Sequence, residues 1–346
     1  MRFFARAIAA ILAASAAAQP GTARADETVS IGVVGAASDI TLYLAQKEGF
    51  LHDEGLAGDI IAFDSGAKMV APLGAGQLDV GAGAWSAGFF NAVDRGVGIK
   101  IVADKATNKA PNDYRWVIVR KALMDQGAIK SLADLKGRKV AVTAAGAGDN
   151  SSLMEALKSV GLTIKDVDRT YLGFPSQFAA LANGGIDAAF NVEPDATIAE
   201  RQGVAAKFVP YSSFYPVQET GVILFGSNFL EKDRAKAGKF MTAFLRAVRF
   251  YDAALQGGHL TGPGAQDVWD ALSQLTKQKD ETVFRDMVAP WSNPNGAIDM
   301  PSLVKDFANF KAMGDVTADI DLKGVVDTSF VTKAVKELGP YRATQR

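Results

Sequence analysis

Short apolar runs alternate with longer amphipathic segments from residue 28 to about residue 225. Helical periodicity marks the longer segments, for example 41–55, 151–161 and 175–185. Strands separated by helices of about 10–15 residues indicate βαβ units, and therefore an α/β fold of mostly parallel sheets covered by helices. The apolar runs predict strands at 29–34, 59–63, 78–83, 99–104, 116–120, 139–143, 169–174, 186–192 and 221–226.

A second pattern suggests that the chain forms two lobes. The segment LGAGQLDV at 73–80 is echoed by LANGGIDA at 181–188, and each reads as a helix end, a glycine cap and a strand that begins at aspartate. Chance recurrence is the alternative, because glycine commonly follows a helix. About 321 residues beyond the leader also favour two cores over one. After about residue 229 the pattern is largely helical until prolines interrupt it near 290–301.

Residues 1–25 have the three parts of an export signal. Arg2 and Arg6 precede an apolar run at 7–18, and Ala23-Arg24-Ala25 forms a cleavage site. The run is shorter than the roughly 20 residues that span a bilayer. We therefore expect a cleaved signal peptide over 1–25 and export to the periplasm. Because the chain has no cysteine, we expect no lipid anchor.

The charge balance of the chain and its few reactive residues exclude several classes of function. Removing the three arginines of residues 1–25 leaves 34 basic and 38 acidic residues, which argues against nucleic acid or an anionic membrane as a partner. The two histidines, His52 and His259, are not in a metal-ligand spacing, and there is no G-x-S-x-G motif. No pair of carboxylates stands out as an acid–base couple. We expect a binding protein rather than an enzyme, with no cofactor and no metal.

The stretch VAVTAAGAGDNSSLME at 140–155 resembles a phosphate-binding turn but lacks the residues that define one. No lysine follows Gly148 as in a P-loop, and Ser151 replaces the third glycine of a dinucleotide loop. The pattern from Ser152 to Glu155 fits a capping box, so we expect the helix to begin with Ser152 as N-cap. The loop then either offers amides and the Ser151 hydroxyl to a ligand or is an ordinary turn. Asp149 would repel an anion or pair with an amine.

In open parallel sheets, ligands bind beyond the carboxyl ends of the strands. Small polar residues, two aromatic residues and several carboxylates follow the predicted strands, which is a typical composition of binding sites. The candidate ligand-binding residues are Ser38, Asp39, Asp64, Ser65, Gly66, Trp85, Ser86, Gly148, Asp149, Asn150, Ser151, Ser152, Phe174, Ser176, Asn191 and Glu193.

Several segments together resemble one protein family. These are TLYLAQKEGFLHDEGL, LGAGQLDVGAGAWSAG, KSLADLKGRKVAV, LANGGIDAAFNVEPDA and VDTSFV, which extend over nearly the whole mature chain. They are similar to the NMT1/THI5-like periplasmic solute-binding proteins of ABC importers for nitrate, sulfonates, taurine and thiamine-pyrimidine precursors. The resemblance implies a monomer that captures a small polar solute and delivers it to a membrane permease and, indirectly, its ATPase.

The resemblance also implies a type II periplasmic-binding-protein fold. One lobe comprises 28–115 with 225–346, the other comprises 116–224, and Trp116–Arg120 and Gly221–Gly226 are the expected crossovers. The solute would sit between the lobes.

Departures from the family leave the charge of the solute open. Sulfonate- and taurine-type members usually have a loop richer in Gly, Ser and Thr where this chain has Asp149 and Asn150, and Arg115 is the one nearby cation we propose. A sulfonate-, taurine- or nitrate-like anion and a pyrimidine or aromatic nitrogen compound are both compatible with these residues. Two alternatives have the same fold. One is a periplasmic sensing module, and the other is a thiamine-pyrimidine synthase-like enzyme, whose cysteine-rich motif this chain lacks.

Overall fold

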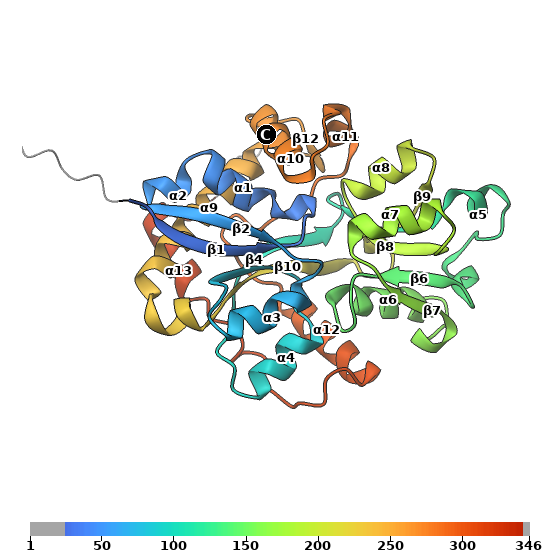
Figure 1. Ribbon diagram of the computed structural model, residues 1–346, viewed down its shortest axis with the longest axis horizontal. Coiled ribbons are helices and arrows are strands. Elements are labelled where there is room, and N and C mark those ends of the chain that lie inside the picture. Colours follow the sequence, from blue (N-terminus) through green and yellow to red (C-terminus); the bar gives the residue numbers. More distant parts are fainter. Residues whose placement is uncertain (1–24, 342–346) are drawn as a thin grey trace, which may run out of the picture.

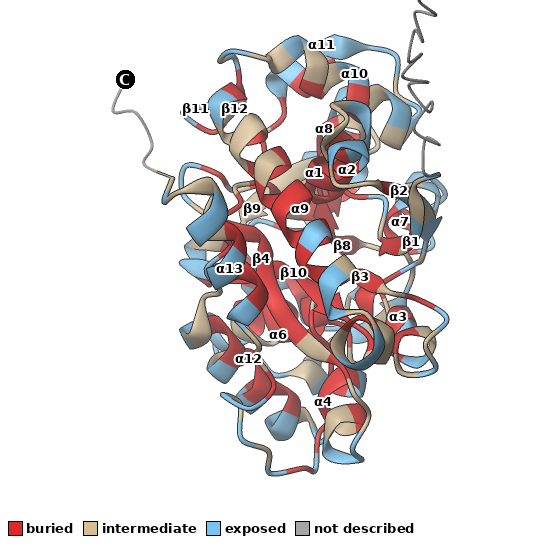
Figure 2. Cartoon of the chain, turned by 90° about the vertical axis from the view of Figure 1, so that its left-hand side faces the viewer, coloured by how far each residue is buried: buried red, intermediate tan, exposed pale blue. Residues whose placement is uncertain are grey.

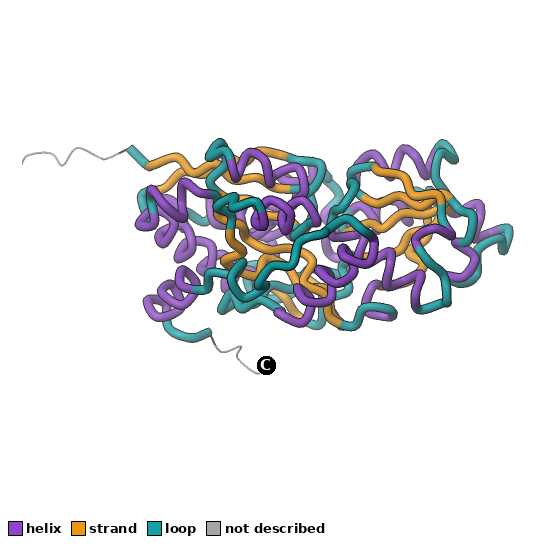
Figure 3. Tube along the Cα trace, turned by 90° about the horizontal axis from the view of Figure 1, so that it is seen from below, coloured by secondary structure: helices purple, strands orange, loops and turns teal. Residues whose placement is uncertain are grey.

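The computed structural model describes residues 25–341 and contains two five-stranded sheets, each flanked by helices (Figure 1). The α/β fold class expected from the sequence is confirmed. The predicted signal peptide lies outside the described residues except for Ala25. Seen from below, the strands form two separate groups that are joined near the middle of the molecule (Figure 3). No helix of residues 25–341 is long and apolar enough to cross a membrane.

The two sheets share one topology. The first has the order β2-β1-β3-β10-β4 and the second the order β7-β6-β8-β5-β9. In each sheet a single strand, β10 or β5, pairs antiparallel with both neighbours, so the other four strands share a direction. The strands of the first sheet are β1 (Glu27–Val33), β2 (Leu56–Ala62), β3 (Val80–Gly83), β4 (Lys100–Lys109) and β10 (Val217–Phe225). Those of the second are β5 (Arg115–Arg120), β6 (Lys139–Val142), β7 (Asp168–Tyr171), β8 (Ala188–Val192) and β9 (Ala205–Pro210).

Helices cover both faces of the first sheet. One core joins the sheet to α1 (Ile40–Lys47), α9 (Arg234–Ala254), α10 (Ala265–Thr276), α11 (Glu281–Asp286) and α13 (Ser329–Leu338). The opposite face packs against α3 (Gly66–Gly74), α4 (Ala87–Asp94) and α12 (Met300–Met313). The short elements α2 (Phe50–Asp53), β11 (Leu255–Gln256) and β12 (His259–Leu260) lie beside the first of these cores. Figure 2 shows that α9, β4 and β10 form the buried centre of this lobe.

The second sheet is covered in the same way. Its faces pack against α5 (Lys121–Asp125) and α6 (Gly148–Lys158) on one side and against α7 (Phe174–Ala182) and α8 (Asp195–Arg201) on the other. Helix α6 begins with Ala147 as N-cap rather than with Ser152. The capping-box prediction was wrong because the chain is already helical at Gly148, which places Ser151 and Ser152 inside the helix.

The crossovers between the sheets differ from those predicted. Trp116–Arg120 lies inside the second sheet as β5, and Gly221–Phe225 lies inside the first as part of β10. Both runs are apolar because they are inner strands with a neighbour on each side, and not because they are hinges. The chain passes between the sheets at 110–114 and 211–216. The strand pairing therefore favours a second lobe of 110–216 over the predicted 116–224.

Candidate functional site

A small pocket, with a cavity volume of about 30 Å³, lies between the two sheets. Its walls come from the carboxyl ends of strands in both lobes and from the helices that follow them, which is the expected place for a ligand in this type of sheet. The lining residues are Val34, Ala36, Ser38, Ser65, Gly66, Ala67, Gly83, Ala84, Lys105, Tyr114, Arg115, Thr143, Ala147, Gly148, Asp149, Phe174, Val192 and Thr220.

Six of the predicted ligand-binding residues line this pocket, namely Ser38, Ser65, Gly66, Gly148, Asp149 and Phe174. The other members of the predicted set are absent from its lining, and their side chains have other surroundings. Whether any of these residues contacts a solute stays a prediction.

Lys105 is a pocket residue that the sequence reasoning missed. It lies on β4, is almost fully buried, and forms an ion pair with the carboxylate of Asp39. The other carboxylate oxygen of Asp39 accepts hydrogen bonds from the backbone of Val34 (3.0 Å) and Ala36 (3.1 Å). A buried charge needs such a partner. Asp39 therefore neutralises Lys105, and a lysine directly after the apolar run 99–104 was the available signal.

Arg115, the first residue of β5, is a buried cation with no carboxylate in direct ion-pair contact among residues 25–341. Its Nε atom has no hydrogen-bond acceptor among residues 25–341. The guanidinium carbon lies 5.2 Å from the ring centroid of Tyr211 and 5.9 Å from that of Phe174. Burial opposes the charge, but neighbouring Tyr211, Tyr114 and Asp149 outweigh it and raise the pKa of Arg115. The side chain therefore presents a permanent positive charge to the pocket.

The carboxylate of Asp149 is used to close the loop that precedes α6. It accepts hydrogen bonds from the backbone of Thr143 (2.6 Å) and from the Thr143 hydroxyl (3.2 Å). Burial raises the pKa of Asp149, although nearby Arg115 opposes that shift. An acid held in this way repels an anion less than a free carboxylate would.

Three helices of eight or more residues begin at the pocket wall. They are α3, α6 and α7, and none has a side-chain cap at its N-terminus. The first N–H groups of a helix have no intrahelical acceptor, and the helix dipole favours negative charge there. The Ser65 hydroxyl, at the start of α3, is buried and has no partner among the described residues. The wall therefore offers several donors to one occupant.

The lobes are in contact around the pocket. The backbone of Ala37 donates to Glu193 (3.1 Å), and that of Ala87 donates to Gly146 (2.9 Å). A Cβ atom built at Gly148 would lie only 2.7 Å from the Cβ of Ala84 in the first lobe. In this structure the second lobe approaches the first too tightly for a side chain at position 148.

Trp85 and Ser151 belong to a buried cluster centred on Asp306 of α12. The Asp306 carboxylate accepts hydrogen bonds from Trp85 Nε1 (2.8 Å), Ser151 Oγ (2.5 Å) and Tyr215 OH (3.0 Å). Gln218 Nε2 lies 3.5 Å from both carboxylate oxygens. Burial raises the pKa of Asp306 to about 6. We call these five residues the Asp306 cluster; it joins α12 to α6 across the lobes.

The remaining predicted residues also have local roles. Ser152 donates to Gln218 (2.9 Å), Asn150 to Ala144 (2.8 Å) and Asn191 to Gln177 (2.7 Å). Ser86 caps α4 through Phe89, Glu193 pairs with Lys207, Ser176 lies in α7, and Asp64 lies opposite Gly173.

Comparison with known proteins identifies the family. A family model described as NMT1/THI5 like matches residues 37–254. A Bacillus subtilis protein named as an aliphatic sulfonates-binding protein is 26% identical over 308 residues, which cover 86% of this chain and 85% of that protein. A Brucella abortus protein named as a binding protein is 28% identical over 212 residues, and the match spans 62% of its length and 61% of this chain.

Solved structures share the fold at low sequence identity. The alkanesulfonate-binding protein SsuA of Xanthomonas axonopodis pv. citri, bound to MOPS, has a TM-score of 0.68 and 18% identity, covering 87% of this chain and 98% of that one. The periplasmic nitrate-binding protein NrtA of Synechocystis PCC 6803 has a TM-score of 0.74 and 14% identity, with coverage of 91% and 89%. The desulfurization enzyme DSZB also has this fold, with a TM-score of 0.64, 14% identity and coverage of 90% and 99%. The resemblance inferred from the sequence motifs is confirmed: the chain belongs to the NMT1/THI5-like family and has the fold of two-lobed periplasmic binding proteins.

Proposed function

We propose that the chain is the solute-binding subunit of an ABC importer and that it captures a small organic monoanion of the sulfonate class. The observation that carries the proposal is Arg115, a buried guanidinium at the pocket wall whose Nε atom has no acceptor among the described residues. A buried donor of a charged group that has no acceptor is costly, so such a site favours an occupant that supplies an acceptor with negative charge.

The electrostatics of the whole pocket favour an anion over an amine. Lys105 is neutralised by Asp39, and burial raises the pKa of Asp149, which weakens its negative charge. Arg115 and the three helix N-termini then supply the positive potential of the pocket. Sulfonate oxygens accept several hydrogen bonds at once, and helix N-termini with arginine suit such groups.

The apolar part of the lining favours an organic anion over a bare inorganic one. Val34, Ala36, Phe174 and Val192 all line the pocket beside the donors. A short carbon chain attached to the anionic group would cover these side chains, and burial of apolar surface adds to the affinity. Nitrate would satisfy Arg115 but leave this surface without a partner.

The proposal includes no catalysis. The chain has no cysteine, and of its two histidines His52 pairs with Asp26 while His259 contacts Met287, so neither lines the pocket. Ser38 and Ser65 therefore have no histidine base beside them in the pocket. We propose that the lobes close on the solute, which is handed unchanged to a membrane permease from the periplasm.

Thermal denaturation with candidate solutes tests the proposed function. We expect methanesulfonate, butanesulfonate or taurine to raise the melting temperature, since a ligand at 100 times its Kd stabilises a protein by about 2.7 kcal/mol. Nitrate tests the inorganic alternative, and an aminopyrimidine tests the nitrogen-compound alternative. Stabilisation by the pyrimidine alone, or by none of the solutes, would contradict the proposal. A sensing module would bind the solute equally well, but it would not support uptake of the solute into vesicles that contain the permease.

Closure over the solute predicts a selective effect of Gly148→Ala. The added methyl group meets Ala84 of the opposite lobe, and overpacking of this kind costs about 1–3 kcal/mol. Because the clash exists only in the closed form, we expect affinity for the sulfonate identified in the screen to fall about tenfold, with an unchanged or higher melting temperature. Gly88→Ala is the matched control, since its methyl group would meet only Ser86 Oγ at 3.7 Å. Equal affinities of the two variants would contradict closure at Gly148.

A further inference from the structure

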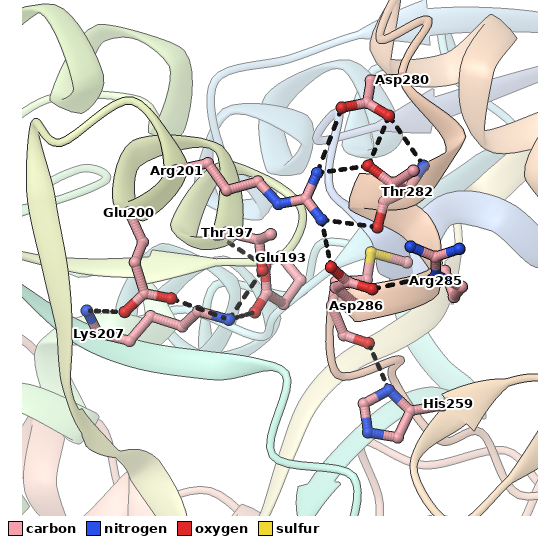
Figure 4. A network of polar contacts seen from close by, with 11 residues as sticks. Glu193, Thr197, Glu200, Arg201, Lys207, His259, Asp280, Thr282, Arg285 and Asp286 are labelled. Atoms are coloured by element: carbon pink, nitrogen blue, oxygen red, sulfur yellow. Dashed lines mark hydrogen bonds and ion pairs between the residues drawn. The ribbon is translucent and has the colours of Figure 1, made fainter.

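One exposed side chain outside the pocket makes several polar contacts between the two lobes. Arg201 is the last residue of α8 in the second lobe, and its guanidinium reaches α11 and the residue before it (Figure 4). Nη1 donates to Asp280 Oδ2 (3.2 Å) and Thr282 Oγ1 (2.7 Å). Nη2 donates to the Thr282 carbonyl (3.0 Å) and pairs with the Asp286 carboxylate. We call this contact the Arg201 clamp.

The acceptor side of the clamp is fixed to the first lobe. Val283 and Phe284 of α11 and Met287 just after it belong to the core of the first sheet together with α1 and α9. Arg201 ends a helix whose Ala196 and Ala199 pack in the core of the second sheet. The clamp therefore adds polar contacts between the lobes to an apolar one, because Ile198 of α8 packs against the core of the first sheet.

The hydrogen bonds and ion pairs of the Arg201 clamp can break at a small cost in free energy. About 31% of the Arg201 side chain is exposed, and its partners Asp280 and Asp286 are 55% and 49% exposed. Water replaces exposed ion-pair partners readily, so such pairs contribute only about 0–1 kcal/mol each. The Asp306 cluster contrasts with it, because its five side chains are almost fully buried and Tyr215 lies in a crossover segment. Separating that cluster would leave polar groups without partners, which costs far more.

We propose that Arg201 is a closure residue, whose bonds to α11 form when the lobes close and set how long a solute stays bound. The inference rests on the proposed solute-binding function for its kinetic consequence. Its structural consequence, a population of the closed form that depends on Arg201, is measured without any solute.

The absence of cysteine from the chain makes the structural measurement direct. Donor and acceptor dyes on Lys136→Cys and Lys333→Cys, at exposed positions in the second and first lobes, report lobe separation by energy transfer. We expect Arg201→Ala to change the transfer efficiency toward a larger separation. In wild type, raising the salt concentration should have the same effect, because it screens exposed pairs.

Arg246→Ala is the matched control. Arg246 is also 31% exposed and pairs with Asp53, which is 53% exposed, but this pair lies between α9 and α2 of one lobe. We expect Arg246→Ala to leave the transfer efficiency unchanged. For the sulfonate that binds in the screen, we expect the dissociation rate to rise about fivefold in Arg201→Ala and not in Arg246→Ala.

Exchanging the charges of Arg201 and Asp286 distinguishes a role of Arg201 in lobe closure from a merely structural role. Arg201→Glu should open the lobes further by repulsion from Asp280 and Asp286, and the double variant Arg201→Glu with Asp286→Arg should restore much of the closed population. Transfer efficiencies of Arg201→Ala and Arg201→Glu equal to that of the Arg246→Ala control would overturn the inference. Failure of every tested solute to bind would contradict the proposed function while the energy-transfer result still decides the role of Arg201.

Discussion

Arg115→Met is expected to weaken binding of an alkanesulfonate by about 10- to 100-fold while the protein stays folded. A hydrogen bond to a charged group contributes about 1.5–3 kcal/mol, and methionine keeps an unbranched apolar stem while it removes the charged guanidinium end. The free energy of unfolding should change little, because removal of a buried cation offsets the loss of its contacts with Tyr211, Phe174 and Asp149. Isothermal titration calorimetry and thermal denaturation measure the two quantities.

Arg120→Met is the control for Arg115→Met. Arg120 lies at the other end of β5, where it pairs with Asp187 at 3.0 Å and does not line the pocket. Its loss should leave the affinity unchanged. An Arg115→Met protein that binds sulfonates as tightly as wild type would remove Arg115 from the site and, with it, the main support for an anionic solute.

Trp85→Ala is expected to lower the free energy of unfolding by about 3–5 kcal/mol, the range for a large aromatic side chain removed from a core. Trp85 is 1% exposed and packs in the core that α3, α4 and α12 form with the first sheet. Its loss also removes one donor from the Asp306 carboxylate. Chemical denaturation monitors the change.

Trp85→Phe separates this stabilising role from the predicted contact with the solute. Phenylalanine keeps most of the ring volume, so we expect a loss of stability of only about 1–2 kcal/mol from the missing hydrogen bond, and an unchanged affinity for the solute. Loss of binding at unchanged stability would instead support the contact with the solute that the strand-end pattern predicted.

The rule that ligands bind beyond the carboxyl ends of parallel strands located the pocket, because the rule needs only the order of strands and loops along the chain. Ser65, Gly66 and Gly148 lie in the loop-to-helix segments that follow strands, so the topology brings them to one edge of each sheet. The rule also selected Trp85 and Ser151, which follow strands equally well. Their partner, Asp306, lies 221 residues after Trp85. A pattern within a short stretch of sequence cannot relate residues that are so far apart along the chain.

The structure also differs from the sequence-based prediction where tertiary contacts outweigh the local conformational preference of the residues. The serines of α6 match a capping signature, yet they bond Asp306 and Gln218 from inside the helix. The apolar runs at 116–120 and 221–226 are compatible with both a hinge and an inner strand, because an apolar run has the same sequence in either place, and the structure has inner strands there. Lys105 was missed because a buried lysine is recognised only by its partner, Asp39, from another element.

The shared topology of the two sheets has a consequence for how the chain folds. Lys109 at the end of β4 pairs with Val217 at the start of β10, and Trp116 of β5 pairs with Pro210 of β9. All of residues 110–216 therefore lie within the loop of a single hairpin in the first sheet. The second lobe is continuous in sequence and can form from its own residues, whereas the first must join two distant segments. Once folded, the inserted lobe holds Lys109 and Val217 side by side, which reduces the loop-closure entropy of completing the first sheet.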